Sequence, residues 1–372
     1  MFKQYQLKNY RFRLVAYVIV LTIIGILVIG SAKQSVQSKQ ILGLAIGLVF
    51  MVIVSLIDYS YILRFWSVWY LMAIFMQVAV LLFGNDVNGS KRWIDLGFFQ
   101  FQPSELSKIL LICFWAAIFV RYHEKLNTLK MLVIFIVASG IPMGLILVED
   151  MSTTIVIALI FITLLFIAGL SYKIILKVLA AAVPAGVVFL ILLLNHAIPM
   201  QEYRYNRILA WLNPEKYSNG AYQQQNSIMA IGSGQLWGKG LNNTSIVSMK
   251  NGNFIAEPQT DFIFAVVGEE LGFVGSVIIV ILLLLIVIEC ILIAKNARDL
   301  SGRLICCGVA ALIGFQSFVN ICVATGLMPN TGLPLPFVSY GLTSLVSLFV
   351  GIGLVLNVGL QPRKYGQGEY LE

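Results

Sequence analysis

Long uninterrupted apolar runs constrain this chain more than any other feature of its sequence. Most of its 372 residues fall in such runs, and each run is roughly 18 to 25 residues long, the length at which an α-helix crosses the hydrocarbon core of a bilayer. Only 11% of the residues are charged, against roughly 25% in a soluble domain. The sequence therefore predicts an all-α, polytopic membrane protein that forms one integral domain over residues 1–372, with the lipid bilayer around it.

We expect about ten transmembrane helices. They are predicted near residues 14–31, 40–57, 66–84, 103–120, 131–148, 152–170, 178–194, 262–294, 302–325 and 338–360. One long polar stretch separates the seventh span from the eighth, and it is predicted to be an extracellular loop at about residues 195–261. Its glycines, amides and aromatic residues favour an ordered loop that lies against the membrane.

Positively charged residues predict which ends of the spans face the cytoplasm. The two termini and the loops after even-numbered spans hold fifteen Lys and Arg residues, whereas the short loops after odd-numbered spans hold four: Lys33, Lys39, Lys91 and Arg92. Short cytoplasmic loops carry the excess of positive charge in membrane proteins, so both termini are predicted to be cytoplasmic. The same asymmetry accounts for most of the net charge of +8, and nucleic-acid binding is not needed to explain it.

Two charged residues stand inside the predicted fourth span. Glu105 and Lys108 are three positions apart, a spacing that places both on one face of a helix, where each can neutralise the other. A charge inside a membrane is costly unless it is paired, and it often marks a functional site. The sequence allows either a structural ion pair or a charged lining for a polar substrate head group.

Five further acids are predicted at or near the outer ends of spans. Glu149 and Asp150 form the turn between the fifth and sixth spans, where Asp150 precedes Ser-Thr-Thr and can cap the following helix. Asp261 begins the eighth span and is either a cap or a chemical group. Glu269 and Glu270 lie about 12 Å deeper along the helix, and two adjacent acids cannot both face lipid. We expect at least one of them to face a cavity.

A proline-rich segment interrupts the pattern of spans at residues 326–336. Pro329, Pro334 and Pro336 lie there, and proline cannot continue a helix. Irregular backbone at membrane depth is tolerated only where it is buried in protein or lines a cavity. The segment therefore predicts a crevice on the outer face.

Seven motifs follow one another along the chain. They are Asn88-Gly-Ser-Lys-Arg-Trp-Ile94, Gln102–Lys108, Glu149–Thr153, Asn206-Arg207 with Leu212–Pro214, Gly238-Lys-Gly240, Pro258–Gly272 and Met328–Gly341. In this order, over nearly the whole chain, they resemble the SEDS family (shape, elongation, division and sporulation proteins), the peptidoglycan glycosyltransferases that include RodA and FtsW. One motif departs from the family pattern, because the turn at Glu149–Thr153 keeps Asp150 but lacks the usual Pro and Gly.

The resemblance implies a substrate, a reaction and a partner. The substrate would be lipid II, a disaccharide-pentapeptide on undecaprenyl diphosphate, polymerised into glycan strands on the outer face of the cytoplasmic membrane. Asp261 would be the essential carboxylate. A class B penicillin-binding protein, which is a transpeptidase, would be the partner. The short basic N-terminus favours the elongation branch, of which RodA is the type, over the division and sporulation branches.

This chemistry suggests roles for the other polar residues. A sugar hydroxyl is a poor nucleophile, so Asp261 is predicted to act as its general base. The lipid diphosphate leaving group needs positive charge, for which Arg207 is the first candidate because its planar fork suits phosphate oxygens. The predicted substrate-binding residues are Arg207, Lys239, Lys91, Arg92 and Lys108, together with Glu105, Asp150 and Ser339. A divalent cation such as Mg²⁺ or Mn²⁺ could share the charge-stabilising role, although no metal-ligand spacing is present.

Two other functions remain open at this point. A flippase for the lipid-linked precursor would use polar residues on several spans, but it needs a path to both faces, and the polar features here concentrate on the outer side. A non-enzymatic scaffold for other cell-wall proteins would not need Asp261 or the basic residues of the loops. The position of buried polar residues along the spans distinguishes the flippase from an enzyme with an outer site.

Overall fold

The computed structural model describes residues 10–87, 90–95, 97, 99–174, 176–177, 180, 184, 202–242 and 257–361. Eight of the helices in this part are long and apolar enough to cross a membrane. They are α1 (Phe12–Ala32), α2 (Gln34–Leu56), α4 (Trp66–Phe83), α5 (Pro103–Arg121), α6 (Leu129–Glu149), α11 (Ile263–Lys295), α12 (Leu300–Ala324) and α13 (Leu342–Leu360). The helix α7 (Met151–Ile167) is apolar and shorter. These nine helices match nine of the ten predicted spans, to within a few residues at most of their ends.

The tenth predicted span, at residues 178–194, lies outside the described residues except for positions 180 and 184. The count of ten therefore stays a prediction. Four shorter helical elements were not predicted: α3 (Tyr59–Arg64), the 3₁₀ turn η3 (His123–Lys125), α9 (Glu202–Leu212) and α10 (Ser218–Ser233). The last two lie within the predicted long loop, which is ordered as expected wherever the structure describes it.

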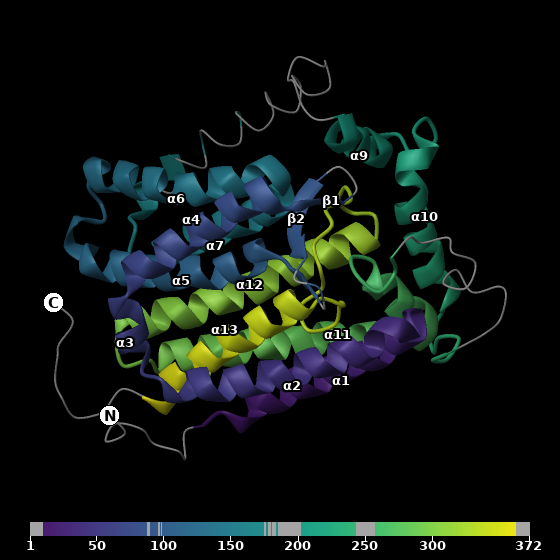
Figure 1. The fold of residues 1–372 in the computed structure, drawn as a ribbon, viewed down its shortest axis with the longest axis horizontal. Coiled ribbons are helices and arrows are strands. Elements are labelled where there is room, and N and C mark those ends of the chain that lie inside the picture. The colour runs from purple at the N-terminus through teal and green to yellow at the C-terminus, as the bar shows by residue number, and fades with distance from the viewer. Residues whose placement is uncertain are drawn as a thin grey trace.

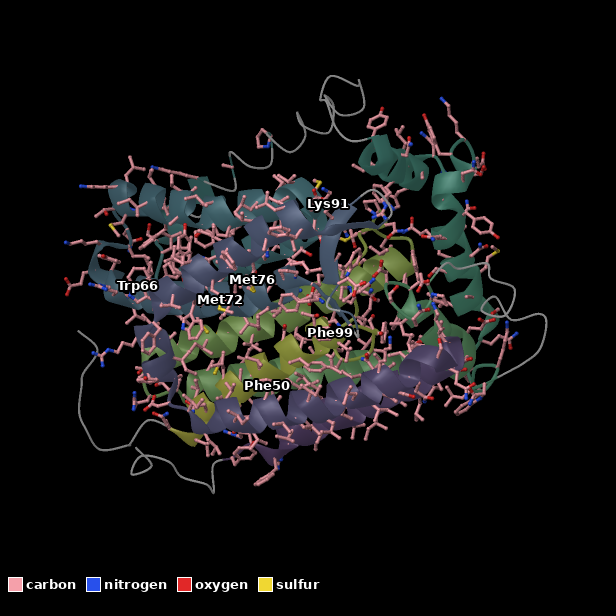
Figure 2. All side chains as sticks on the ribbon, in the orientation of Figure 1. Phe50, Trp66, Met72, Met76, Lys91 and Phe99 are labelled. Carbon is pink, nitrogen blue, oxygen red and sulfur yellow. The ribbon has the colours of Figure 1, made fainter. Side chains whose placement is uncertain are left out.

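The helices form one bundle whose two ends differ in character (Figure 1). One end carries α9, α10 and a small sheet, and we call it the sheet end. The opposite end carries α3, and we call it the α3 end. Figure 2 places Trp66 at the α3 end and Lys91 at the sheet end. Side chains such as Phe50, which is 45% exposed, cover the outside of the bundle, as a lipid-facing surface requires.

A three-stranded antiparallel sheet at the sheet end makes the fold not purely helical. Its strands are β1 (Asn85–Val87), β2 (Ser90–Asp95) and β3 (Gln100–Phe101), and β2 is the central one. Asp86 pairs with Lys91, and Asp95 pairs with Gln100. The prediction of helices alone missed this sheet. It forms the connection between α4 and α5 and places Arg92 at the sheet end of the bundle.

Small residues allow α2 and α13 to lie close together along their length. Gly43 and Gly47 of α2 face Leu342 and Phe349 of α13, and a Cβ atom on Gly353 would lie 2.7 Å from the Met51 carbonyl oxygen. Membrane helices commonly associate through such surfaces, because packing and not water exclusion holds them together. This contact fixes where α13 begins, and hence where the preceding loop must end.

The helix α11 is broken at Gly272, where the backbone has φ +67° and ψ −164°. The segment after α10 fills the break. The backbone N–H groups of Lys239 and Gly240 donate to the carbonyl oxygens of Glu269 and Glu270, 2.9 Å each, and the N–H of Phe273 donates to the Gln235 carbonyl oxygen at 2.8 Å. The long eighth span is therefore two helical segments joined at Gly272. The segment after α10 hydrogen-bonds to the backbone groups at this break, which lipid could not satisfy.

Gly272→Ala should lower the thermal stability of the purified protein. A Cβ atom there would lie 2.3 Å from the Gly238 nitrogen, and the positive φ disfavours any residue with a side chain. Backbone strain of this kind costs about 1–3 kcal/mol before the clash is counted. Thermal unfolding in detergent measures the loss. Gly140→Ala is the control, because an added Cβ meets nothing within 4 Å there. Equal melting temperatures for the two variants would contradict this account of the break.

Candidate active site

Asp261 lies at the sheet end, two residues before α11 begins at Ile263. The residue in the cap position is Phe262, and no side chain among the described residues hydrogen-bonds to this helix end. The interpretation of Asp261 as a helix cap is therefore wrong. Its side chain is half-buried, and its backbone carbonyl oxygen accepts a hydrogen bond of 2.7 Å from Asn320 of α12. The backbone at Asp261 is thus held against α12, and its carboxylate is not used for capping.

Two arginines approach the Asp261 carboxylate from different parts of the chain. Gly332, in the segment 325–341 between α12 and α13, which we call the proline loop, lies among the three groups. A Cβ atom built on Gly332 would lie 3.3 Å from Asp261 Oδ2, 3.5 Å from Arg92 Nη1 and 3.9 Å from Arg207 Nη1. The missing side chain of Gly332 therefore lets the proline loop lie close to one carboxylate and two guanidinium groups.

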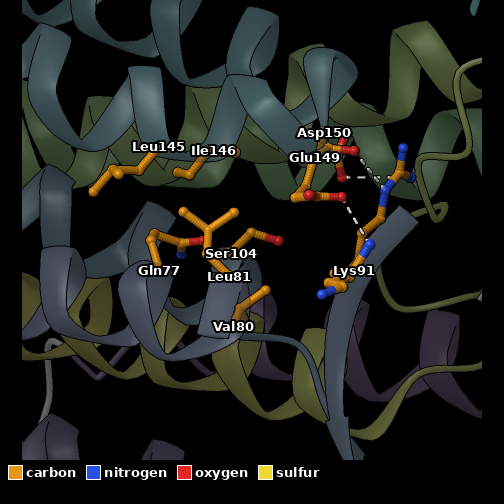
Figure 3. A pocket seen from close by; sticks show the side chains of 10 residues that line it. Gln77, Val80, Leu81, Lys91, Ser104, Leu145, Ile146, Glu149 and Asp150 are labelled. Atoms are coloured by element: carbon orange, nitrogen blue, oxygen red, sulfur yellow. Dashed lines mark hydrogen bonds and ion pairs between the residues drawn. The ribbon is translucent and has the colours of Figure 1, made fainter. Parts of the chain in front are cut away.

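Arg92 belongs to β2 and is held by the turn between α6 and α7. Its Nε donates to the Glu149 carbonyl oxygen at 3.0 Å, and its Nη1 lies 3.6 Å from Asp150 Oδ2. The backbone N–H of Lys91 donates to Glu149 Oε2 at 2.7 Å. These contacts border a pocket with an apolar wall (Figure 3). Its polar lining residues are Gln77, Lys91, Arg92, Ser104, Glu149 and Asp150.

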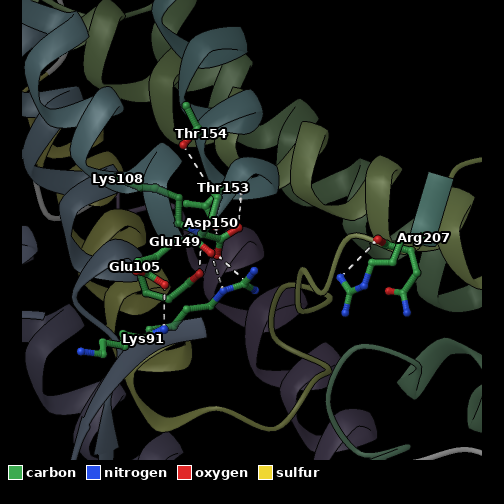
Figure 4. Close-up of polar contacts among 10 residues, drawn as sticks. Lys91, Glu105, Lys108, Glu149, Asp150, Thr153, Thr154 and Arg207 are labelled. Atoms are coloured by element: carbon green, nitrogen blue, oxygen red, sulfur yellow. Dashed lines mark hydrogen bonds and ion pairs between the residues drawn. The ribbon is translucent and has the colours of Figure 1, made fainter. Parts of the chain in front are cut away.

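Arg207 belongs to α9 and contacts the proline loop. Its Nη1 donates to the Asn330 carbonyl oxygen at 3.3 Å, and from the same helix Trp211 Nε1 donates to the Gly326 carbonyl oxygen at 2.9 Å. Figure 4 shows Arg207 on one side of the loop and the cluster around Asp150 on the other. The two arginines therefore meet across the loop at Gly332, which no sequence spacing could have shown.

Asp150 caps α7, as the sequence indicated. Its carboxylate accepts from the Thr153 backbone N–H at 3.0 Å and from Thr153 Oγ1 at 2.8 Å, and it is buried. Its nearness to Arg92 places its charge beside the site. A place for Asp150 in substrate binding stays a prediction.

The pKa of Asp261 is raised because the carboxyl lies away from bulk water. The pKa rises from its ordinary value of 3.8 to about 6, and burial is the largest cause. The positive charges of Arg207 and Arg92 act in the opposite direction, and they limit the rise. The negative charges of Asp150 and Glu257 add to it. A carboxyl with this pKa is ionised at neutral pH and basic enough to accept a proton in a transition state.

Glu105 and Lys108 form the ion pair that their spacing predicted. Lys108 Nζ lies 2.7 Å from Glu105 Oε1 and donates to Gln316 Oε1 at 2.6 Å, and each side chain of the pair is 1% exposed. Gln316 in turn donates to the Pro334 carbonyl oxygen at 2.9 Å. The pair therefore lies in the core and supports the proline loop, and its contact with substrate stays a prediction.

The other predicted binding residues are also engaged by the protein. Lys239 Nζ lies 2.8 Å from Glu269 Oε1, about 12 Å along α11 from Asp261. Ser339 Oγ donates to the Thr260 carbonyl oxygen and accepts from the Leu335 N–H, both at 2.7 Å. The structure thus brings Arg92, Arg207 and Asp150 to Asp261, and it uses the side chains of Lys239 and Ser339 to hold the loops together.

Glu269 and Glu270 differ from their prediction. We expected at least one to face a cavity, but both are buried, one beside Lys239 and the other accepting from Ser31 Oγ at 2.5 Å. Each acid therefore faces a polar protein group supplied by a distant segment.

Sequence reasoning missed the two amides of α12 that hold the proline loop. Gln316 and Asn320 are buried, and their spacing of four places both on one face of α12. The signal was present, because two amides at helical spacing inside an apolar span need partners there. What they bind could not be read from the sequence.

The residues near Asp261 do not fit a divalent cation held by the protein alone. The charges closest to its carboxylate are guanidinium groups, which repel a cation. Among the described residues, no three His, Cys, Asp or Glu side chains come together as a ligand set. Positive charge at this site comes from the two arginines.

Most buried polar side chains of the membrane-crossing helices lie in the half of the bundle nearer the sheet end. They include Gln40, Gln77, Glu105, Lys108, Asp150, Gln316 and Asn320, whereas Ser55, Glu289 and Asn357 lie nearer the α3 end. In the described part of the chain this distribution favours a site at one end over a polar path between both ends.

Known proteins similar to this chain share both its sequence pattern and its fold. The family model of cell cycle proteins named for FtsW, RodA and SpoVE matches residues 8–364. A probable peptidoglycan glycosyltransferase FtsW from Haemophilus ducreyi is 36% identical, over 79% of this chain and 72% of that protein. Its counterpart from Trichlorobacter lovleyi is 32% identical, over 96% and 94%.

Solved structures agree with these sequence relatives. A chain of a peptidoglycan synthase complex that coordinates polymerization and crosslinking superposes with a TM-score of 0.78 at 28% identity, covering 94% of this chain and 97% of that one. The rod shape determining protein RodA of Thermus thermophilus superposes with a TM-score of 0.67 at 26% identity, covering 94% and 96%.

Glu105→Ala should destabilise the protein by about 3–5 kcal/mol, because it removes one partner of a buried ion pair and leaves the Lys108 charge in the core. The double variant Glu105→Leu with Lys108→Met is the control, since it removes both charges at similar volume and should recover most of the loss. Thermal unfolding in detergent compares the three proteins. A double variant less stable than Glu105→Ala would show that the buried charge is not the cause.

Proposed function

The chain belongs to the FtsW, RodA and SpoVE family of cell cycle proteins, and we propose that it is a peptidoglycan glycosyltransferase that polymerises lipid II into glycan strands. One observation carries the proposal beyond the family: Asp261 and two arginines come together at Gly332 of the proline loop. A base beside two phosphate-binding groups is the equipment that transfer from a lipid diphosphate requires.

The reaction can be assigned to these groups step by step. The Asp261 carboxylate accepts the proton of the acceptor sugar hydroxyl as the hydroxyl oxygen bonds to the anomeric carbon of the donor. The bond between that carbon and the diphosphate oxygen breaks on the opposite face, so the anomeric centre inverts. Arg92 and Arg207 stabilise the negative charge that the diphosphate gains as it leaves.

Charge asymmetry supports an outer location for this site. Lys and Arg residues are concentrated in the termini and in the loops at the α3 end, including Arg64, Arg121 and Lys295. By the positive-inside rule that end, with both termini, faces the cytoplasm. The sheet end then faces outward, in the outer half of the cytoplasmic membrane, where lipid II presents its sugars after transport.

A class B penicillin-binding protein is the partner we propose. The similar solved chain belongs to a synthase complex that coordinates polymerization and crosslinking, and crosslinking needs a transpeptidase. The names of the relatives do not separate the elongation and division branches, because the similar sequences carry the name FtsW and the similar structure the name RodA. The elongation branch stays our preference.

The first test is polymerisation of lipid II by the purified protein and its transpeptidase in liposomes. Wild type should make glycan strands, and Asp261→Asn should make none while it keeps the wild-type melting temperature, because the amide cannot accept a proton in the transition state. The variant Asn357→Ala is the control for a buried polar change at the α3 end, and it should stay active.

Other outcomes of this experiment would overturn the proposal. Equal strand formation by wild type and Asp261→Asn would remove Asp261 from the role of base. If folded wild type made no strands, lipid transport by a flippase would become the better reading, and movement of labelled lipid II across sealed vesicles would test it.

The rate of polymerisation should depend on pH with a limb near pH 6. The ionised form of Asp261 is the active base, and its pKa is about 6. As pH falls below that value the carboxyl takes up a proton, so the rate should fall about tenfold per pH unit. Initial rates between pH 5 and 8 measure the limb. A flat profile over this range would contradict the assignment.

A further inference from the structure

Asn320 of α12 connects the two segments that border the proposed site. Its Nδ2 donates to the carbonyl oxygens of Asp261 and Leu333, at 2.7 Å each. Leu333 follows Gly332, which faces the Asp261 carboxylate. One buried side chain therefore ties the backbone at Asp261 to the proline loop beside Gly332.

The contacts of the neighbouring residues show why this link matters. Gln259, Thr260 and Asp261 present three consecutive carbonyl oxygens. The first accepts from the Tyr340 N–H at 2.8 Å and the second from Ser339 Oγ at 2.7 Å. Both donors belong to the proline loop itself. Only the third carbonyl, that of Asp261, is held from α12 among the contacts of the described residues, and α12 is a regular helix packed in the core.

Asn320 is also unfavourable from the viewpoint of folding alone. It is 1% exposed, and its Oδ1 has no hydrogen-bond partner among the described residues. A buried acceptor without a partner is costly and needs an explanation. The explanation here is that the Asn320 Nδ2 group donates to two carbonyl oxygens at the site. These two bonds fix the orientation of the side chain and leave Oδ1 without a partner among the described residues.

Asn357 of α13 provides the contrast. It is equally buried and also ties two backbone segments, at the α3 end. Its Nδ2 donates to the Ser55 carbonyl oxygen at 2.8 Å, and its Oδ1 accepts from the Tyr59 N–H at 2.9 Å. Both ends of this amide are satisfied, as expected of a residue that serves stability.

We propose that Asn320 is a positioning residue for the glycosyl transfer, which holds Asp261 and the proline loop at the separation that the reaction requires. It acts through Asp261 and does not touch substrate. This inference rests on the proposed function, because its effect is on the rate of that reaction. Misplacement of a reacting group by about 1 Å can lower a rate roughly 100-fold.

The test compares Asn320→Ala with Asn357→Ala, each assayed as full-length protein with its transpeptidase in liposomes containing lipid II. Both variants remove a buried amide, so both should lower the melting temperature. Asn320→Ala should lower kcat roughly 10- to 100-fold with little change in KM, and it should move the acid limb of the pH–rate profile. Asn357→Ala should keep kcat within twofold of wild type and leave the limb in place.

Two results would overturn the inference. Wild-type kcat and an unmoved acid limb in folded Asn320→Ala would show that the side chain serves stability alone. Equal losses of kcat in both variants would show that any buried amide has the same effect. Asn320→Ser, which keeps one donor, carries the same comparison should Asn320→Ala not fold. Failure of wild type to polymerise lipid II would instead reject the proposed function, so the two failures can be told apart.

Discussion

The hydrogen bonds of buried side-chain amides to the proline loop are the interactions on which the rest of the site depends. Residues 325–341 have no regular helix to satisfy their backbone, and at the edge of a bilayer water cannot be relied on to do so. Gln224 of α10 therefore donates to the Val323 and Met328 carbonyl oxygens, and Gln316 to that of Pro334. With its backbone fixed in this way, the loop can hold Gly332 against Asp261.

Electrostatics then determines what the held loop can do. The carboxylate of Asp261 is partly removed from bulk water, which raises its pKa, and two guanidinium groups limit the rise, so it is ionised at neutral pH. The same two groups lie beside Gly332, where the absence of a side chain lets the proline loop approach them. Lys239, which follows α10, is paired with Glu269 of α11. Among the described residues this leaves Arg92 and Arg207 as the basic groups beside Asp261. Two guanidinium groups therefore lie close to Asp261, and the negative charges of Asp150 and Glu257 also act on it.

Much of the fold could be predicted, because apolar run length is a direct consequence of bilayer thickness. The sheet was missed although Asn88-Gly89 is a known hairpin signal, since short strands are weak beside long spans. The break at Gly272 was missed because an apolar run of 33 residues can as well be one tilted helix. The cap at Asp150 and the pair of Glu105 with Lys108 were predicted correctly, because both depend only on neighbours along one helix.

The sequence by itself determined a membrane bundle, the asymmetry of its basic residues, the local ion pair and the motifs that mark the family. Each of these follows from local spacing or composition. Only the tertiary structure decided that Arg92 of β2, Arg207 of α9 and Asp261 come together at Gly332, and that Asn320 joins Asp261 to the proline loop. These residues are brought together by helix packing and by a loop whose path is set by backbone hydrogen bonds, and such long-range contacts leave no periodic trace in a single sequence.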